Sequence, residues 1–232
     1  MKMLKVTCAT LIAASLLVTS GCNSMNNTGK GALIGGGGGA AAGAGIGALI
    51  GGGKGAGIGS AIGAVVGAGA GALIGKKMDK QQEQLAQTLP EAKVEPTVDQ
   101  NGLQAIKVTF DGGILFPTGK YTLNPQAQQD LSQFAVSLKQ NPLTDVQIIG
   151  FTDNTGSFAV NQKLSAERAD AVLTYLVNSG VSPTRLTAKG VPMADYVASN
   201  ETAAGRAQNR RVEIYITASP EMVQEAENGS LK

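Results

Sequence analysis

Glycine recurs at every fourth position from Gly31 to Gly75, and this strict period constrains the chain more than any other feature of its sequence. Alanine, isoleucine, leucine and valine fill most of the positions between, and Lys54 is the only charged residue in the block. Each half of the block is about as long as one membrane span. Glycine disfavours a helix in water by about 1 kcal/mol relative to alanine, whereas in lipid a helix satisfies every backbone group.

Small residues at every fourth position let two helices approach closely in a membrane. We therefore predict a helical hairpin, a glycine zipper, that forms a membrane segment over residues 31–75 and turns at Gly52-Gly53-Lys54. Two alternatives stay open. The block could be a disordered Gly/Ala linker, although such a linker needs no strict period. It could also assemble as a homo-oligomer and form a pore, although neither half carries a charged residue that would select ions.

The N-terminal segment is similar to a bacterial lipoprotein signal peptide. Two lysines give it a positive start, a short apolar stretch follows, and Cys22 comes after small residues. This resemblance predicts a signal peptide over residues 1–21, acylation of Cys22 and a lipidated N-terminus over residues 22–30. Two or more acyl chains hold a protein on a bilayer far better than one. Asn23 at the next position favours sorting to the outer membrane.

The composition argues against several classes of function. The net charge of +2 gives no electrostatic case for binding nucleic acid. The chain has no histidine, and both of its cysteines, Cys8 and Cys22, lie in the N-terminal segment. The commonest general base and the usual zinc ligands are therefore missing from the rest of the chain. We expect no metal site, no cofactor and no catalytic residues.

Beyond the glycine block, the pattern of apolar residues predicts one folded domain over residues 103–217. Residues 76–102 begin with several lysines and contain two prolines, which predicts a solvated linker, and residues 218–232 are predicted to be a polar tail. Within the domain the order β-α-β-α-β-(α)-β indicates an α/β sandwich, preceded in the chain by the helical hairpin. The expected strands cover residues 105–110, 146–151, 186–190 and 211–217.

The stretch from Gly150 to Ala169 carries the candidate site. An apolar strand ends here, Asp153 lies in a segment of turn composition, and a helical pattern follows. At about 100° per residue, Arg168 and Asn161 fall within the apolar stripe that contains Leu164. A guanidinium on such a stripe needs a partner, because an unpaired buried charge is costly. Asp153 is the nearest acidic candidate, so the two would either form a salt bridge or bind a ligand that carries both charges.

A long series of positions in this domain follows the order of a known family. They are Gly150, Thr152, Asp153, Asn161, Leu164, Ser165, Arg168, Ala169, Gly180, Arg185, Gly190, Asn200, Thr202, Gly205, Arg206, Asn209, Arg210 and Arg211. With this series the domain resembles the OmpA-type peptidoglycan-binding domains. Together with the lipoprotein signal and the zipper, the whole chain looks like the YiaD-like outer-membrane lipoproteins of Gram-negative bacteria.

The resemblance implies that Asp153 and Arg168 hold the free end of diaminopimelate in a peptidoglycan stem peptide. That end carries a carboxylate beside an ammonium, which suits a guanidinium fork next to a carboxylate. Asn161 would add a hydrogen bond, and Leu164 would pack beside the aliphatic part of the ligand. The other candidate residues are Thr152, Arg210 and Arg211. For each of these two arginines, contact with the ligand and a purely structural role stay equally open.

The resemblance thus implies a lipid-anchored protein of the outer membrane that binds peptidoglycan in the periplasm and tethers the membrane to the wall. The alternative is a zipper oligomer that forms a pore or an assembly element, with wall binding secondary. A private salt bridge between Asp153 and Arg168 would leave no ligand site. Hydrolysis of a glycan would need a second carboxylate about 5–9 Å from Asp153, and its candidates Glu167 and Asp170 project away from the Arg168 face.

Overall fold

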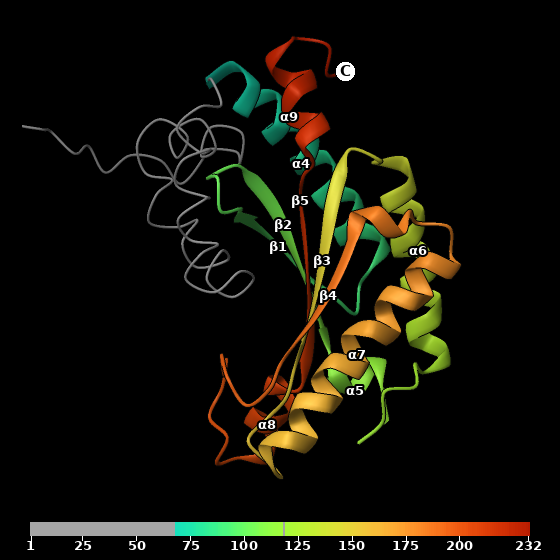
Figure 1. Cartoon of the computed structure of the whole chain (residues 1–232), viewed down its shortest axis with the longest axis vertical. Helices are drawn as coiled ribbons and strands as arrows, with labels where there is room; N and C mark the ends of the chain where they lie inside the picture. Colours follow the sequence, from blue (N-terminus) through green and yellow to red (C-terminus); the bar gives the residue numbers. More distant parts are fainter. Residues whose placement is uncertain (1–67, 118) are drawn as a thin grey trace, which may run out of the picture.

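The computed structural model describes residues 68–117 and 119–232 of the 232-residue chain (Figure 1). The predictions for the signal peptide, for Cys22 and for the zipper up to residue 67 lie outside the described residues. Within the described ranges, no helix combines the length and the apolar character that crossing a membrane requires.

A five-stranded sheet forms the centre of the domain, with the strand order β1-β2-β5-β3-β4. Neighbouring strands are antiparallel except β3 and β4, which run parallel. The strands are β1 Lys93–Val98, β2 Gln104–Asp111, β3 Thr144–Phe151, β4 Leu186–Val191 and β5 Arg211–Ala218. The predicted α/β sandwich is confirmed. β1 was not predicted, and Pro96 fits there because an edge strand tolerates a missing N–H.

Three long helices cover one face of the sheet, α4 (Ala68–Thr88), α6 and α7 (Figure 1). α6, Pro125–Gln140, begins after Asn124 as predicted, although the Asn124 side chain makes no capping hydrogen bond. α7, Phe158–Asn178, begins after Ser157, whose hydroxyl accepts a hydrogen bond from the Val160 N–H. The shorter helices are α5 Gly112–Leu115, η1 Pro183–Arg185, α8 Ala203–Asn209 and α9 Pro220–Glu227.

Two glycines let α7 lie directly on the sheet. A methyl group at Gly150 in β3 would collide with the Ser165 carbonyl oxygen, and one at Gly190 in β4 would collide with the Ser165 hydroxyl and the Ala166 N–H. Because the colliding atoms are mostly helix backbone, no side-chain rotation could relieve these contacts. The glycines therefore fix the distance and the rotation of α7, and with them the position of Arg168 on its buried side.

Residues 76–102 are not the solvated linker that we predicted. α4, Ala68–Thr88, runs through the first part of this range and packs against β1, β2, α6 and α9. Ile74, Met78 and Leu85 are fully buried on one side of the helix. Their spacing follows the helical period, but the lysines and glutamines of this segment outnumber them and suggested a solvated segment.

Residues 218–232 are likewise not a polar tail. β5 ends at Ala218, α9 follows, and Met222, Ala226 and Leu231 are buried. α9 packs against α4 at the upper end of the molecule in Figure 1. Residues 68–75, the end of the predicted membrane segment, are helical as predicted, but their Ala70 and Ile74 side chains belong to the core of the domain.

Candidate functional site

The segment after β3 turns sharply into α7 at the lower end of the molecule in Figure 1. Gly156 allows the turn because its φ of 90° is in the left-handed region. Asn161 in α7 ties the turn to the helix, since its Nδ2 donates hydrogen bonds of 2.8 Å to the Thr155 carbonyl and 3.1 Å to the Ser157 carbonyl. The turn is thus held in place around Asp153.

Asp153 is buried, with 5% of its surface exposed. Its Oδ2 accepts a hydrogen bond of 2.7 Å from Nη1 of Arg210, and its Oδ1 accepts one of 2.8 Å from the Thr155 N–H. Burial alone would raise the pKa of the Asp153 carboxyl, but these hydrogen bonds and the Arg210 charge outweigh it and hold that pKa below its usual range. Asp153 is therefore an ionised carboxylate at neutral pH.

Arg168 is buried as well, with 3% of its surface exposed. Its Nε donates a hydrogen bond of 3.1 Å to the Lys120 carbonyl, and its guanidinium carbon lies 5.2 Å from the centre of the Phe116 ring. Its Nη1 is buried and has no hydrogen-bond partner. Burial and the nearby Arg210 charge lower the pKa of Arg168, while Asp153 opposes them. An arginine still stays protonated, so the site holds a buried cation with an unused donor.

Arg210, rather than Arg168, is the ion-pair partner of Asp153. No carboxylate in residues 68–117 and 119–232 forms an ion pair with Arg168. The hypothesis that Asp153 and Arg168 form a salt bridge with each other is therefore wrong. The Arg210 side chain is 38% exposed, so the Asp153–Arg210 pair reaches the surface on one side.

Thr152 and Leu164 lie at the same end of the domain as Asp153, but neither contacts the Asp153 side chain through a hydrogen bond. The Thr152 hydroxyl accepts a hydrogen bond of 3.0 Å from the Met193 N–H and thereby holds the loop after β4. Leu164 is half-buried on α7. Thr152 thus has a visible structural role, whereas Leu164 keeps part of its apolar surface free.

Arg211 lies on the other face of the sheet. Successive residues of a strand point to opposite faces, and Arg211 shares its face with Glu213 rather than with the helix-covered core. Its Nε donates a hydrogen bond of 2.6 Å to Glu213, and its guanidinium carbon lies 3.8 Å from the centre of the Phe151 ring. Both side chains of this ion pair are buried. The structure therefore separates Arg211 from Asp153 and Arg168.

Several other residues of the family series hold loops. Asn209 accepts hydrogen bonds from the Val197 and Ala198 N–H groups and donates to the Ala198 carbonyl. Arg185 donates to the carbonyls of Leu138, Asn141 and Thr144, where α6 ends and β3 begins. These side chains find their partners within the fold, so their presence in the series reflects folding.

The cluster as a whole combines one carboxylate with two guanidinium groups. Asp153 and Arg210 are 57 positions apart in the sequence, and no local sequence pattern indicates that they pair. Phe116 and the Lys120 carbonyl were also missed, because they come from the segment after β2 and no charge or period marks them. An arrangement of this kind suits a small ligand group that carries a carboxylate next to a cation.

Comparisons with known proteins find two families that match parts of this chain. Residues 115–210 match the OmpA family, and residues 1–79 match the YMGG-like Gly-zipper family. The chain is 42% identical to "Probable lipoprotein YiaD" of Escherichia coli over 115 residues. The aligned segment covers 50% of this chain and 52% of that protein. It is also 42% identical to "Peptidoglycan-binding protein ArfA" of Mycobacterium tuberculosis over 112 residues. That aligned segment covers 48% of this chain and 34% of that protein.

A solved structure gives the same fold. The cell wall anchor of the T6SS from Pseudomonas aeruginosa matches 61% of this chain and 97% of its own length, with a TM-score of 0.51 and 28% sequence identity. The chain spans about half of the length of the Escherichia coli relative and about a third of the mycobacterial one.

Proposed function

Since the chain belongs to the OmpA family through residues 115–210, we propose that its domain binds peptidoglycan non-covalently. The recognised group is the free end of a diaminopimelate residue in a stem peptide. Arg168 and Arg210 bind its carboxylate, and Asp153 binds its ammonium. Opposite charges within hydrogen-bonding distance form strong, directional contacts, and a guanidinium fork matches a carboxylate geometrically.

The buried, unpartnered Nη1 of Arg168 is the observation that carries this proposal. A native fold rarely leaves a buried donor unsatisfied, and the exceptions need an explanation. A ligand carboxylate at Arg168 would supply the missing acceptor and neutralise a charge that burial destabilises. Asp153 is already ionised and rigidly held, so it needs no rearrangement to accept an ammonium.

The other candidate residues take different parts in the proposed site. Asn161 positions the turn, because its amide nitrogen already donates to Thr155 and Ser157. Thr152 supports the neighbouring loop through Met193. The free side of Leu164 is available to the aliphatic part of the ligand. We leave Arg211 out of the ligand site, since its charge is matched by Glu213 on the other face of the sheet.

The proposed role of the whole chain is to tether the outer membrane to the cell wall. Acylated Cys22 and the glycine zipper would hold the N-terminus on the membrane, with the domain in the periplasm. The match of residues 1–79 to the YMGG-like Gly-zipper family supports this arrangement, as does the name of the Escherichia coli relative. In this role the protein is a binder and has no catalytic step.

Titration of the full-length chain with defined stem peptides tests the ligand site. The parent should bind a peptide that ends in free diaminopimelate more tightly than one with lysine in its place, because lysine lacks the carboxylate. Arg168→Met should lose most of this preference, since only Arg210, which is already paired with Asp153, would remain as a cation for that carboxylate. Lys163→Met, on the exposed side of the same helix, should behave like the parent.

The two peptides and the two proteins form a double-mutant cycle. If Arg168 binds the diaminopimelate carboxylate, Arg168→Met and the lysine peptide should each weaken binding, and their combination should weaken it little further. Additive effects of the two changes would show that Arg168 acts elsewhere. Unchanged binding by folded Arg168→Met and by folded Asp153→Asn would refute the site altogether.

A further inference from the structure

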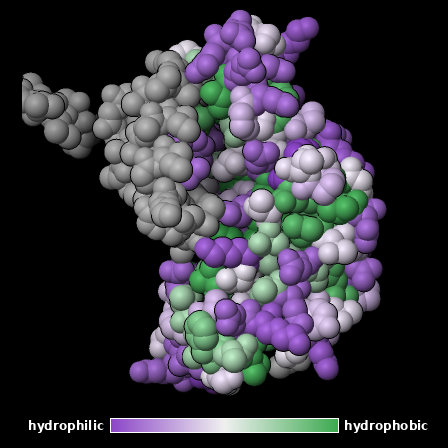
Figure 2. Space-filling view, in the orientation of Figure 1, coloured by the Kyte–Doolittle hydropathy of each residue, from purple (hydrophilic) through white to green (hydrophobic). Residues whose placement is uncertain are grey.

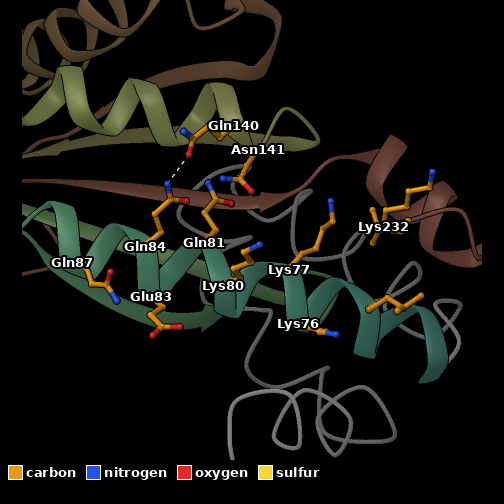
Figure 3. Close-up of a pocket in the computed structure, with 12 residues that line it drawn as sticks. Lys76, Lys77, Lys80, Gln81, Glu83, Gln84, Gln87, Gln140, Asn141 and Lys232 are labelled. Atoms are coloured by element: carbon orange, nitrogen blue, oxygen red, sulfur yellow. Dashed lines mark hydrogen bonds between the residues drawn. The ribbon is translucent and has the colours of Figure 1, made fainter.

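A hollow of about 860 Å³ lies beside α4, far from the Asp153 cluster (Figure 3). Its walls come from α4, from the end of α6 at Gln140 and Asn141, and from the last residues of the chain. This volume is in the range of small-molecule sites. In Figure 1 the start of α4 and α9 lie at the upper end of the molecule, whereas α8 and the start of α7 lie at the lower end.

Hydrogen-bond donors dominate the lining of this hollow. Lys76, Lys77, Lys80 and Lys232 line it, and among the described residues that line it Glu83 alone has an acidic side chain. In the part of the chain that the structure describes, none of these lysines forms an ion pair. Figure 3 shows Lys77 and Lys80 pointing to the side of α4 that faces Gln140 and Asn141, while Glu83 points away.

Gln81 adds an independent indication of a ligand. It lines the hollow beside Lys80, is 2% exposed, and its buried amide nitrogen has no hydrogen-bond partner. Its neighbour Gln84 is satisfied by a hydrogen bond of 2.6 Å to Gln140. An unpaired buried donor among unpaired ammonium groups calls for an acceptor with negative charge, because such an acceptor would satisfy the donor and reduce the repulsion between the lysines.

The position of the hollow along the chain identifies the source of the anion. Leu73 lines the same hollow and is 39% exposed, and it lies in α4 between Gly71 and Gly75, the last two glycines of the period-four block. At a membrane surface, the exposed leucine would lie near the lipid acyl chains and the lysines that follow it would lie near the lipid phosphates. Figure 2 shows mostly hydrophilic side chains at this end of the molecule, around α9.

We propose that this hollow binds the phosphate of an anionic phospholipid headgroup, with Lys77, Lys80 and Gln81 as its main contacts. The inference goes beyond wall binding and rests on the proposed membrane anchoring only for the lipid as the source of the phosphate. It places a lipid contact and the wall site at opposite ends of one folded domain.

Calorimetric titration of the full-length chain in detergent with short-chain, water-soluble lipids tests this site. Dihexanoyl-phosphatidylglycerol should bind, and dihexanoyl-phosphatidylcholine, which has no net charge, should bind far more weakly. A partly exposed ion pair contributes up to about 1 kcal/mol, so losing two lysine–phosphate contacts should weaken binding by up to about thirty-fold. We therefore expect the double variant Lys77→Gln/Lys80→Gln to lose about that factor for phosphatidylglycerol.

Two controls keep the result interpretable. Lys93→Gln/Lys163→Gln removes the same charge outside the hollow and should bind phosphatidylglycerol like the parent, and Gln81→Leu should weaken binding several-fold without any change in charge. Equal binding of the two lipids, or an unaffected Lys77→Gln/Lys80→Gln variant with the parent's melting temperature, would overturn the proposal. Inorganic phosphate binding as tightly as phosphatidylglycerol would overturn the lipid as the ligand.

The wall site is tested separately with the same proteins. Lys77→Gln/Lys80→Gln should sediment with peptidoglycan like the parent, and Arg168→Met should bind phosphatidylglycerol like the parent. A failure of either site in its own assay therefore leaves the other result standing.

Discussion

Replacing Arg168 by methionine should remove ligand binding without destabilising the fold. The substitution loses the hydrogen bond to the Lys120 carbonyl and the contact with the Phe116 ring. A hydrogen bond to a charged group contributes about 1.5–3 kcal/mol, and a cation–π contact about 0.5–2 kcal/mol. Against these losses, methionine removes a buried cation whose desolvation costs several kcal/mol and which has no carboxylate partner among the described residues.

These opposing contributions are of similar size, so the free energy of unfolding should change by no more than about 1 kcal/mol. In a domain of this size that corresponds to a shift in melting temperature of about 2–4 °C. Affinity for the stem peptide should fall by about 2–5 kcal/mol, or about thirty- to several-thousand-fold, since the ligand carboxylate would lose its buried partner.

Arg211→Met provides the matched control, because Arg211 is the other buried arginine whose guanidinium stacks on a phenylalanine ring. Here Glu213, with 5% of its surface exposed, would be left buried without its cation. Breaking a buried pair in this way costs about 3–5 kcal/mol. Urea unfolding of both variants, with peptide titration on the same samples, makes the comparison. A loss of 3 kcal/mol or more in Arg168→Met, or retained ligand binding, would refute the reasoning.

Three further predictions concern the scaffold and the ionisation of the site. Gly150→Ala should lower the free energy of unfolding by about 1–3 kcal/mol, because the added methyl group would collide with the backbone of α7. The control Gly113→Ala, with open space around it, should leave the protein as stable as the parent, and thermal unfolding compares the two variants. Because Ile74 belongs to the core, Ile74→Ala should lower the free energy of unfolding by about 2–5 kcal/mol, and Leu73→Ala, at a 39% exposed position, should lower it much less; urea unfolding compares them. The pKa of Asp153 is lower in the folded than in the unfolded protein, where it is about 4, so ionised Asp153 stabilises the fold above that pH and this contribution is lost as the pH falls. The difference in the free energy of unfolding between the parent and Asp153→Asn should therefore shrink below about pH 4. A difference that stays constant from about pH 7 to pH 3 would contradict the assignment.

Much of the fold could be predicted because its signals are local. The apolar run of β3, the alternation of apolar residues in β5 and the turn glycine after α7 lie within short windows of sequence. The helical stripe also placed Arg168 on the buried side of α7, as the structure has it. These features follow from the period of each element, which the sequence displays directly.

The errors arose where tertiary contacts decide the structure. α4 carries Ile74, Met78 and Leu85 at helical spacing, but its lysines and glutamines outnumber them, and only the contact with the sheet and α9 makes the helix part of the domain. The same holds for α9, whose Met222 and Ala226 are buried against other elements. Composition describes the solvent side of such helices better than the side that packs.

The partner of Asp153 is the most instructive of these differences. Sequence proximity favoured Arg168, but the chain places Arg210, from the end of α8, on the carboxylate. Arg185, Asn209 and Arg211 belong to the same family series, and each is matched by carbonyls, amides or a carboxylate within the domain. Arg168 alone among these four has a buried nitrogen without a partner. Because folding explains the satisfied side chains, that unused donor distinguishes Arg168 from the other three and is the reason that we propose it, and not them, as a ligand contact.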